Sequence, residues 1–151
     1  MRIAVGADHA GFGLKEEVKR ILERLGAQYE DFGTMSQDAV DYPDVAGRVA
    51  RAVSDGSFDL GVLVCGTGTG MAMAANKVPG IRAASVNTAE LARLSRSHND
   101  ANILALGGRF TSPAAAEQIV RAFIETPFEG GRHERRIQKI RALERPSGSN
   151  L

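Results

Sequence analysis

Five short apolar runs, separated by stretches with helical periodicity, constrain the fold more than any other feature of this sequence. The runs are rich in β-branched residues, each is followed by a glycine or a polar turn, and they cover residues 3–7, 28–32, 60–64, 83–86 and 103–106. Between them, apolar side chains recur every three to four residues. This alternation predicts βαβ units, and therefore a parallel sheet that carries helices on both faces.

The expected fold class is α/β: a single domain with an open, doubly wound, Rossmann-like sheet of about five strands in three αβα layers. A helical pattern after Gly131 adds a C-terminal helix. The sequence contains no repeat or linker, so we expect one domain over residues 1–145 and a flexible tail over residues 146–151. Ligands of such sheets bind beyond the carboxyl ends of the strands, so the residues there are the candidates for function.

Composition narrows the class of protein. The 19 Lys and Arg residues nearly balance the 18 Asp and Glu residues, so no global field favours nucleic acid or an anionic membrane. The longest apolar stretch, residues 60–65, is far shorter than the ~20 residues of a membrane-spanning helix. The N-terminal residues do not resemble a signal peptide, and the single Cys65 cannot form an internal disulfide. We therefore expect a cytoplasmic protein.

A glycine-rich loop follows the third apolar run, in the sequence Cys65-Gly66-Thr67-Gly68-Thr69-Gly70. Alternating glycines allow a sharp turn that directs several backbone N–H groups at one point, and the start of the next helix adds positive potential. The loop is thus a candidate anion site, although a tight turn that serves only packing is the alternative. The same N–H groups could make a Cys65 thiolate available, whereas a buried, inert cysteine is the simpler interpretation.

Two histidines adjoin predicted strands. Asp8 and His9 close the first strand, and His98 lies in Ser97-His98-Asn99-Asp100 just before the fifth. We expect both histidines to converge with Cys65 on one edge of the sheet, as acid–base groups or phosphate contacts. A solvent-exposed or merely hydrogen-bonded histidine is the alternative for each.

Three arginines are candidates for binding phosphate. Arg109 follows the fifth strand, and Arg132 and Arg136 are four residues apart on one face of the last helix. A guanidinium group binds phosphate oxygens bidentately, so this pair could clamp a phosphate. A solvated basic face is the alternative.

No cofactor or metal is expected. His9, Cys65, His98 and His133 show no spacing typical of a metal site. The glycine loop reads G-x-G-x-G rather than the dinucleotide-binding G-x-G-x-x-G, and the phosphate-binding Walker pattern is absent from the sequence.

Taken together, seven blocks in order resemble the type B ribose-5-phosphate isomerases, which are grouped with galactose-6-phosphate and allose-6-phosphate isomerases. The resemblance extends from Arg2 to about Leu143. The blocks are Gly6-Ala7-Asp8-His9-Ala10-Gly11, Asp41-Tyr42-Pro43, Cys65-Gly66-Thr67-Gly68-Thr69-Gly70, Ala75-Asn76-Lys77, Gly80-Ile81-Arg82-Ala83, Ser97-His98-Asn99-Asp100-Ala101-Asn102 and Glu129-Gly130-Gly131-Arg132-His133.

The resemblance implies a role for each candidate residue. His98, helped by Thr67, would open the furanose ring, and Cys65 would take the C2 proton to give a cis-enediolate. Backbone N–H groups of residues 66–70 would meet its negative charge. The other residues that the resemblance assigns are the sugar or phosphate contacts Asp8, His9 and Asn99 and the phosphate ligands Arg109, Arg132 and Arg136.

Members of the resembled family use either the cysteine or a glutamate just after the glycine loop as base. Met71 stands at the later position here, which places the chain with the cysteine type. The resemblance also implies homodimers, sometimes paired into tetramers, whose sites take residues from both subunits. Three alternatives to a ribose-5-phosphate isomerase stay open. The chain could isomerise another sugar phosphate, such as allose 6-phosphate or galactose 6-phosphate. It could instead bind a sugar phosphate without catalysis, or bind nucleic acid through the basic last helix.

Overall fold

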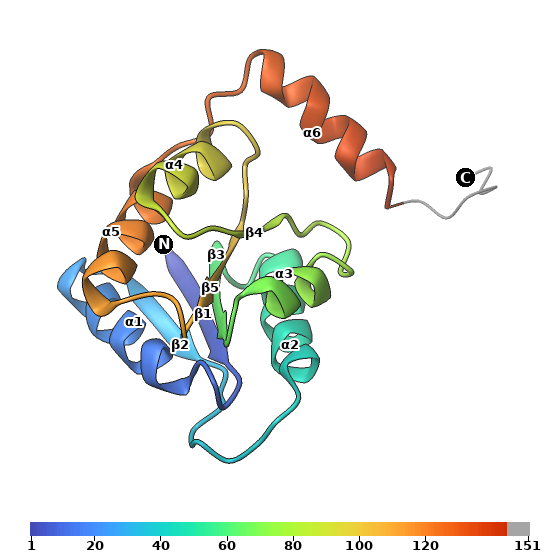
Figure 1. The fold of residues 1–151 in the computed structure, drawn as a ribbon. Helices are drawn as coiled ribbons and strands as arrows, with labels where there is room; N and C mark the ends of the chain where they lie inside the picture. The colour runs from blue at the N-terminus through green and yellow to red at the C-terminus, as the bar shows by residue number, and fades with distance from the viewer. Residues whose placement is uncertain (145–151) are drawn as a thin grey trace.

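The computed structural model describes residues 1–144, and it has the expected α/β architecture (Figure 1). The strands are β1 (Arg2–Ala7), β2 (Gln28–Asp31), β3 (Leu60–Cys65), β4 (Ala83–Ser85) and β5 (Ile103–Gly107). The helices are α1 (Phe12–Arg24), α2 (Tyr42–Ser54), α3 (Thr69–Ala75), α4 (Ala89–Ser97), α5 (Pro113–Glu125) and α6 (Arg132–Ala142). The tail expected over residues 146–151 lies outside the described residues.

The five strands form one sheet in the order β2-β1-β3-β5-β4, and every pairing is parallel. The chain adds β2 on one side of β1 and then β3 on the other. The direction of winding therefore reverses between β1 and β3, and ligands of such sheets bind in the crevice beyond the carboxyl ends of the strands at this point.

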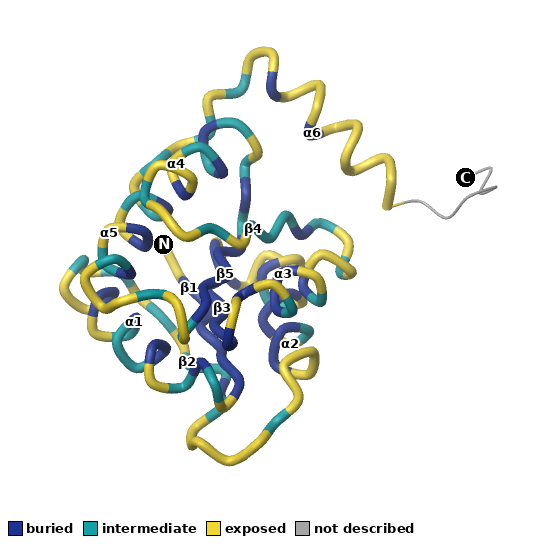
Figure 2. Tube along the Cα trace, in the orientation of Figure 1, coloured by how far each residue is buried: buried dark blue, intermediate teal, exposed yellow. Residues whose placement is uncertain are grey.

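Helices cover both faces of the sheet, because successive strand residues point to opposite sides. On β1, Ile3 and Val5 join the core beneath α1, α4 and α5, whereas Ala4 joins the core beneath α2 and α3. The three inner strands are buried along almost their whole length, as the dark tube in Figure 2 shows. The predicted three-layer arrangement is confirmed.

Helix α6 lies outside this three-layer body (Figure 1), and the residues after it return to the segment between α3 and β4, where the Gly80 N–H donates to Glu144 Oε1 at 2.8 Å. His133 and Ile137 of this helix are buried, while Ile140 and the capping residue Leu143 are exposed. Ile140 and Leu143 line a cavity of about 470 Å³ with the segment between α3 and β4, so the expected apolar stripe is only partly covered by the same chain. Among the described residues, no helix has both the length and the apolar character needed to cross a bilayer.

Candidate active site

The turn after β3 brings a backbone donor to the only cysteine of the sequence. Gly68 has the left-handed φ of 85°, and a Cβ there would lie 3.0 Å from the carbonyl carbon of Leu106. A side chain at this position would therefore be strained as well as crowded. The turn directs the Gly68 N–H to Cys65 Sγ at 3.1 Å. The loop backbone therefore holds the Cys65 sulfur in place as a hydrogen-bond acceptor.

A hollow of about 300 Å³ opens beside this thiol at the carboxyl edge of the sheet. Its lining residues are Asp8, His9, Ala10, Tyr42, Cys65, Gly66, Thr67, Gly70 and Arg109. The sequence-based expectation that the ends of β1, β3 and β5 would share one site is thus matched for most of the candidates. Gly68 and Thr69 belong to the same loop but do not line the hollow.

Two hydrogen bonds position the residues that follow β1. Buried Asp8 accepts the Gly11 N–H through Oδ1 at 3.0 Å, which holds the turn into α1. His9 accepts the Val40 N–H through Nδ1 at 3.3 Å. The proton of the neutral His9 ring therefore lies on Nε2, which can donate to an oxygen of a ligand.

Arg109 supplies a permanent positive charge to the hollow. Its backbone N–H donates to the Gly66 carbonyl at 3.1 Å, and a Cβ on Gly66 would lie 3.2 Å from the guanidinium carbon. The arginine therefore packs directly over the loop that carries Cys65. This arrangement favours a small anionic ligand, because the guanidinium group and the loop N–H groups attract the same negative charge.

Tyr42 is a lining residue to which the sequence assigned no role. It is the first residue of α2, and its ring lies so close to the glycine loop that a Cβ on Gly70 would be 2.7 Å from two ring carbons. Pro43 is a signal that could have located it, since proline favours the first turn of a helix and so marks where α2 begins.

The expected convergence of His98 with Cys65 on one edge of the sheet is wrong within a single chain. Helix α4 runs antiparallel to the strands, so His98 at its C-terminus lies near the edge where β5 begins. Asp100, two residues later, lines a second hollow with Met1 and Leu60, which adjoin the starts of β1 and β3. Asn99 lies between His98 and Asp100, and it is therefore also remote from Cys65.

The arginines of α6 are separated from the hollow as well. Arg132 and Arg136 belong to the helix that leaves the three-layer body, and neither lines the hollow at Cys65. The candidate residues of one chain thus divide into two groups: those around Cys65, and those near His98 and α6.

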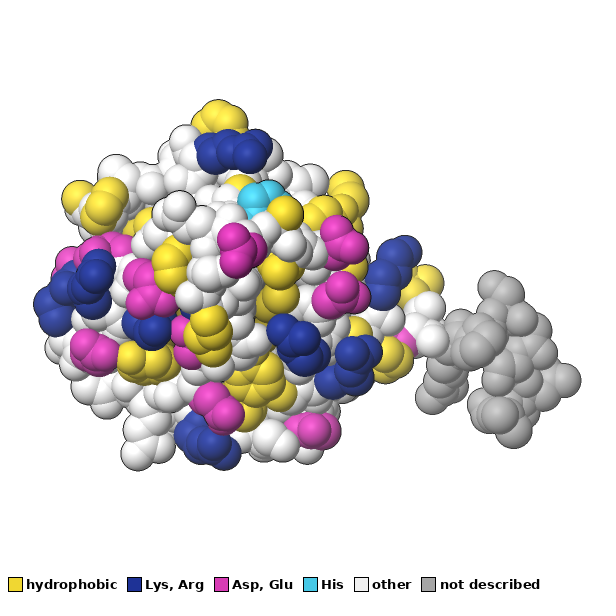
Figure 3. Space-filling model, turned by 90° about the horizontal axis from the view of Figure 1, so that it is seen from below, with side chains coloured by type: hydrophobic (Ala, Val, Ile, Leu, Met, Phe, Trp, Pro, Cys, Tyr) yellow, Lys and Arg dark blue, Asp and Glu magenta, His cyan; other side chains and the backbone are white. Residues whose placement is uncertain are grey.

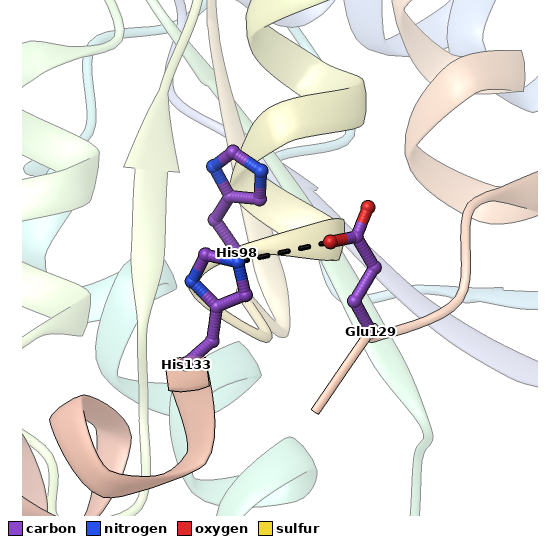
Figure 4. A group of neighbouring side chains, drawn as sticks. All are labelled: His98, Glu129 and His133. Carbon is purple, nitrogen blue, oxygen red and sulfur yellow. Dashed lines mark ion pairs between the residues drawn. The ribbon is translucent and has the colours of Figure 1, made fainter. Parts of the chain in front are cut away.

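His98 instead forms a cluster with His133 and Glu129 (Figure 4). The two imidazole rings stack with centroids 4.3 Å apart, and His133 Nε2 lies 3.7 Å from Glu129 Oε2. Desolvation by burial, together with the positive potential of His98 and Arg132, lowers the pKa of His133, although Glu129 acts in the opposite direction. Sequence reasoning missed this cluster because its histidines are distant in the chain and are joined only by the packing of α6.

The surrounding surface carries charges of both signs. Figure 3 views the molecule from below its orientation in Figure 1, and basic and acidic side chains of the described residues are interspersed there with apolar ones. This face therefore carries no field of a single sign that would attract a polyanion.

Fold and site together define an open α/β protein whose cysteine-bearing glycine loop faces a hollow lined by Asp8, His9 and Arg109. A family model described as Ribose/Galactose Isomerase matches residues 3–140. The chain belongs to the Ribose/Galactose Isomerase family.

Relatives match along nearly their whole length. Ribose-5-phosphate isomerase B of Escherichia coli K12 is 46% identical over 143 residues, which cover 95% of this chain and 96% of the relative. The solved ribose-5-phosphate isomerase B of Clostridium thermocellum superposes with a TM-score of 0.94 at 49% identity, covering 95% of this chain and 97% of that one. The Mycoplasma genitalium enzyme, solved with bound ribulose-5-phosphate, has a TM-score of 0.91 at 44% identity and covers 95% of each chain.

Proposed function

We propose that this protein interconverts ribose 5-phosphate and ribulose 5-phosphate, the step of the pentose phosphate pathway that moves a proton between C1 and C2. The observation that carries the proposal is the Cys65 thiol, held by the Gly68 N–H at the wall of the hollow that Arg109 also lines. The full-length similarity to ribose-5-phosphate isomerase B of Escherichia coli supports the same activity.

In this proposal Cys65 acts as the general base. Its thiolate removes the proton from C2, the C–H electron pair forms the C1–C2 double bond, and negative charge moves to the oxygen on C1. Backbone N–H groups of the loop over residues 66–70 meet this charge, as donors of an oxyanion hole do. The proton is then delivered to C1. The proton of the C2 hydroxyl passes to the negatively charged oxygen on C1, so C2 becomes the carbonyl of the ketose and C1 carries a neutral hydroxyl.

Substrate contacts are proposed for both groups of candidate residues. Asp8, His9 and Arg109 line the hollow and would bind the sugar or its phosphate. The residue just after the loop is Met71, which cannot accept a proton, so Cys65 is the proposed base. The contacts proposed from outside the hollow are Asn99 for the sugar and Arg132 and Arg136 for the phosphate. The preference for a five-carbon substrate over allose or galactose 6-phosphate rests on the similarity to ribose-5-phosphate isomerase B of Escherichia coli.

We propose further that a second copy of the chain completes the site, in a homodimer or a tetramer built from it. His98 is needed to open the furanose ring with the help of Thr67, yet it lies near the opposite edge of its own sheet from Cys65. Ile140 and Leu143, both exposed at the C-terminal end of α6, give an apolar surface for such an association. A reducing cytoplasm is the proposed location, because the reaction requires a free thiol.

The activity is tested by incubating the protein, freed of metal by chelation, with ribose 5-phosphate in heavy water while NMR follows C2 and C1. Ribulose 5-phosphate carrying solvent deuterium at the carbon that receives the proton is the expected result, and Cys65→Ala should slow turnover by at least about 100-fold. If Cys65→Ala still binds the sugar phosphate and the native protein shows no turnover, the chain is a binding protein. If Cys65→Ser keeps most of the activity, Thr67 or a water held by Asp8 takes the proton instead.

The shared site has its own test. Cys65→Ala and His98→Asn are each expected to be inactive alone, and the two proteins are then mixed, dissociated and reassembled. Random pairing gives half mixed dimers with one intact site in each, so about a quarter of the native activity should return. No recovery in a mixture shown to contain mixed dimers would mean that both residues act within one subunit.

A further inference from the structure

Three groups that commonly bind metals meet where α4 ends and α6 begins. One ligand atom from each of His98, Glu129 and His133 can be chosen so that all lie within 4.8 Å of one another. The two segments are tied at this point, because the Glu129 N–H donates to the Ser97 carbonyl at 3.1 Å. The cluster lies where these two segments meet (Figure 4), and none of its three residues lines the hollow at Cys65 of the same chain.

The donor set fits a borderline-soft divalent ion. Two imidazole nitrogens and a carboxylate oxygen bind Zn²⁺ at about 2.0–2.2 Å, so neighbouring ligand atoms of a tetrahedral site are about 3.3 Å apart. The present spacing exceeds this by about 1.5 Å at most. The stacked rings, inclined by 14°, must also turn so that one nitrogen of each points at the same ion, and rotation of the half-buried His98 and the exposed Glu129 supplies this movement. His133 is buried, so its side chain is already held in place before an ion binds.

We propose that His98, Glu129 and His133 form an inhibitory site for a divalent transition-metal ion, for which Zn²⁺ is the best match, with water in the fourth position. A bound ion occupies the imidazole lone pair of His98 and so removes the acid that opens the sugar ring. The inhibition rests on the proposed function, whereas the binding of the ion does not. No spacing typical of a metal site marks this cluster, because α6 brings its two histidines together from distant parts of the chain.

Binding is tested by titrating Zn²⁺ into the chelator-stripped protein in a calorimeter, and by adding Co²⁺ and recording its visible absorption. One ion per chain is expected, with the intense Co²⁺ bands of a site of low coordination number. Glu129→Gln should weaken binding at least about tenfold, since loss of even an outer-shell partner has an effect of that size. His133→Gln should weaken it further, and thermal unfolding would show that each variant is folded.

Two control variants locate the ion. Glu134→Gln removes a neighbouring exposed carboxylate on α6 that is outside the cluster, and it should leave binding unchanged. Cys65→Ala should also bind zinc with native affinity. If Cys65→Ala abolishes binding while Glu129→Gln and His133→Gln retain it, the ion sits on the thiol and the proposed site is wrong.

Inhibition is measured as the activity of each variant with zinc divided by its own activity without zinc. Zinc should inhibit the native protein and Glu134→Gln equally, chelation should reverse the effect, and Glu129→Gln should need at least about tenfold more zinc. Zinc bound at the cluster without inhibition would overturn the inhibitory role. Zinc binding that follows the cluster in a protein without isomerase activity would refute the proposed function and leave the metal site standing.

Discussion

Replacing Lys15 with methionine tests how the loop after β2 is held. Lys15 lies on α1, its side chain is fully buried, and Nζ donates to both carboxylate oxygens of Asp31 at 2.8 and 2.7 Å and to the Thr34 carbonyl at 2.5 Å. Methionine keeps most of the length and apolar bulk of lysine but removes the charge and the three donated hydrogen bonds. The Asp31 carboxylate and the Thr34 carbonyl then lose their main partner.

The expected loss of stability depends on the hydrogen-bond partners that Asp31 keeps after Lys15 is replaced. Removing one partner of a buried ion pair costs about 3–5 kcal/mol, because the other charge is left uncompensated. Here Lys19 remains at 3.0 Å and the Gly33 N–H at 2.9 Å, so the lower end of that range applies. A loss of about 3 kcal/mol lowers the Tm of a chain of this length by about 6–12 °C.

Urea unfolding followed by circular dichroism at pH 7 measures this loss. The double variant Lys15→Met with Asp31→Asn should recover part of it, because the asparagine leaves no charge unpaired. A loss below about 1 kcal/mol, the size typical of an exposed ion pair, would refute the reasoning. So would a double variant that is less stable than the sum of the two single changes predicts.

The same pair sets an acid dependence. Burial by itself would raise the pKa of Asp31, but hydrogen bonds from Lys15, the Gly33 N–H and Lys19 outweigh it and lower the pKa below 3.8. The resulting stability is present above the unfolded pKa of 3.8 and is lost as the pH falls through the lower folded value. The Lys15→Met variant should show a smaller loss in this window.

Further variants test packing and protonation elsewhere. Gly107→Ala should cost about 1–3 kcal/mol in urea unfolding, because its Cβ would lie 2.8 Å from the Thr67 carbonyl oxygen. The matched Gly13→Ala, with no atom from beyond its own helix within 4 Å, should stabilise the protein by about 0.5 kcal/mol. The pKa of His133 is lower in the folded protein than its ordinary value of 6.5, so the Tm of the native protein should fall as the pH is lowered from 6.5 towards the folded-state pKa. In His133→Gln the Tm should depend less on pH over this range.

The sheet and one half of the candidate site could be predicted because both follow from a single rule. Parallel strands end at one edge, so Asp8, Cys65 and Arg109, which all follow strands, had to lie near one another. Applied to His98 the same rule gives the opposite answer, because this residue ends a helix that returns the chain to the other edge. A residue just before a strand and a residue just after a strand lie at opposite edges of the sheet, and the prediction for His98 did not distinguish the two.

Other contacts had no local signal. The stacking of His98 with His133 depends on the path of the chain between α5 and α6, where Gly130 and Gly131 have positive φ values. Short-range periodicity carries no information on such a path. Tyr42 lay within a recognisable helix start, but its approach to Gly70 depends on how α2 packs against α3.

The Cys65 thiol also determines how the protein responds to oxidation. It is 5% exposed, it accepts the Gly68 N–H, and the sequence contains no other cysteine. A sulfenic acid formed there has no thiol in its own chain with which to form a disulfide, so its return to the reduced state depends on a small external thiol entering the hollow. Oxidative damage to this protein is therefore repaired only as fast as the surrounding thiol pool can reach one recessed sulfur atom.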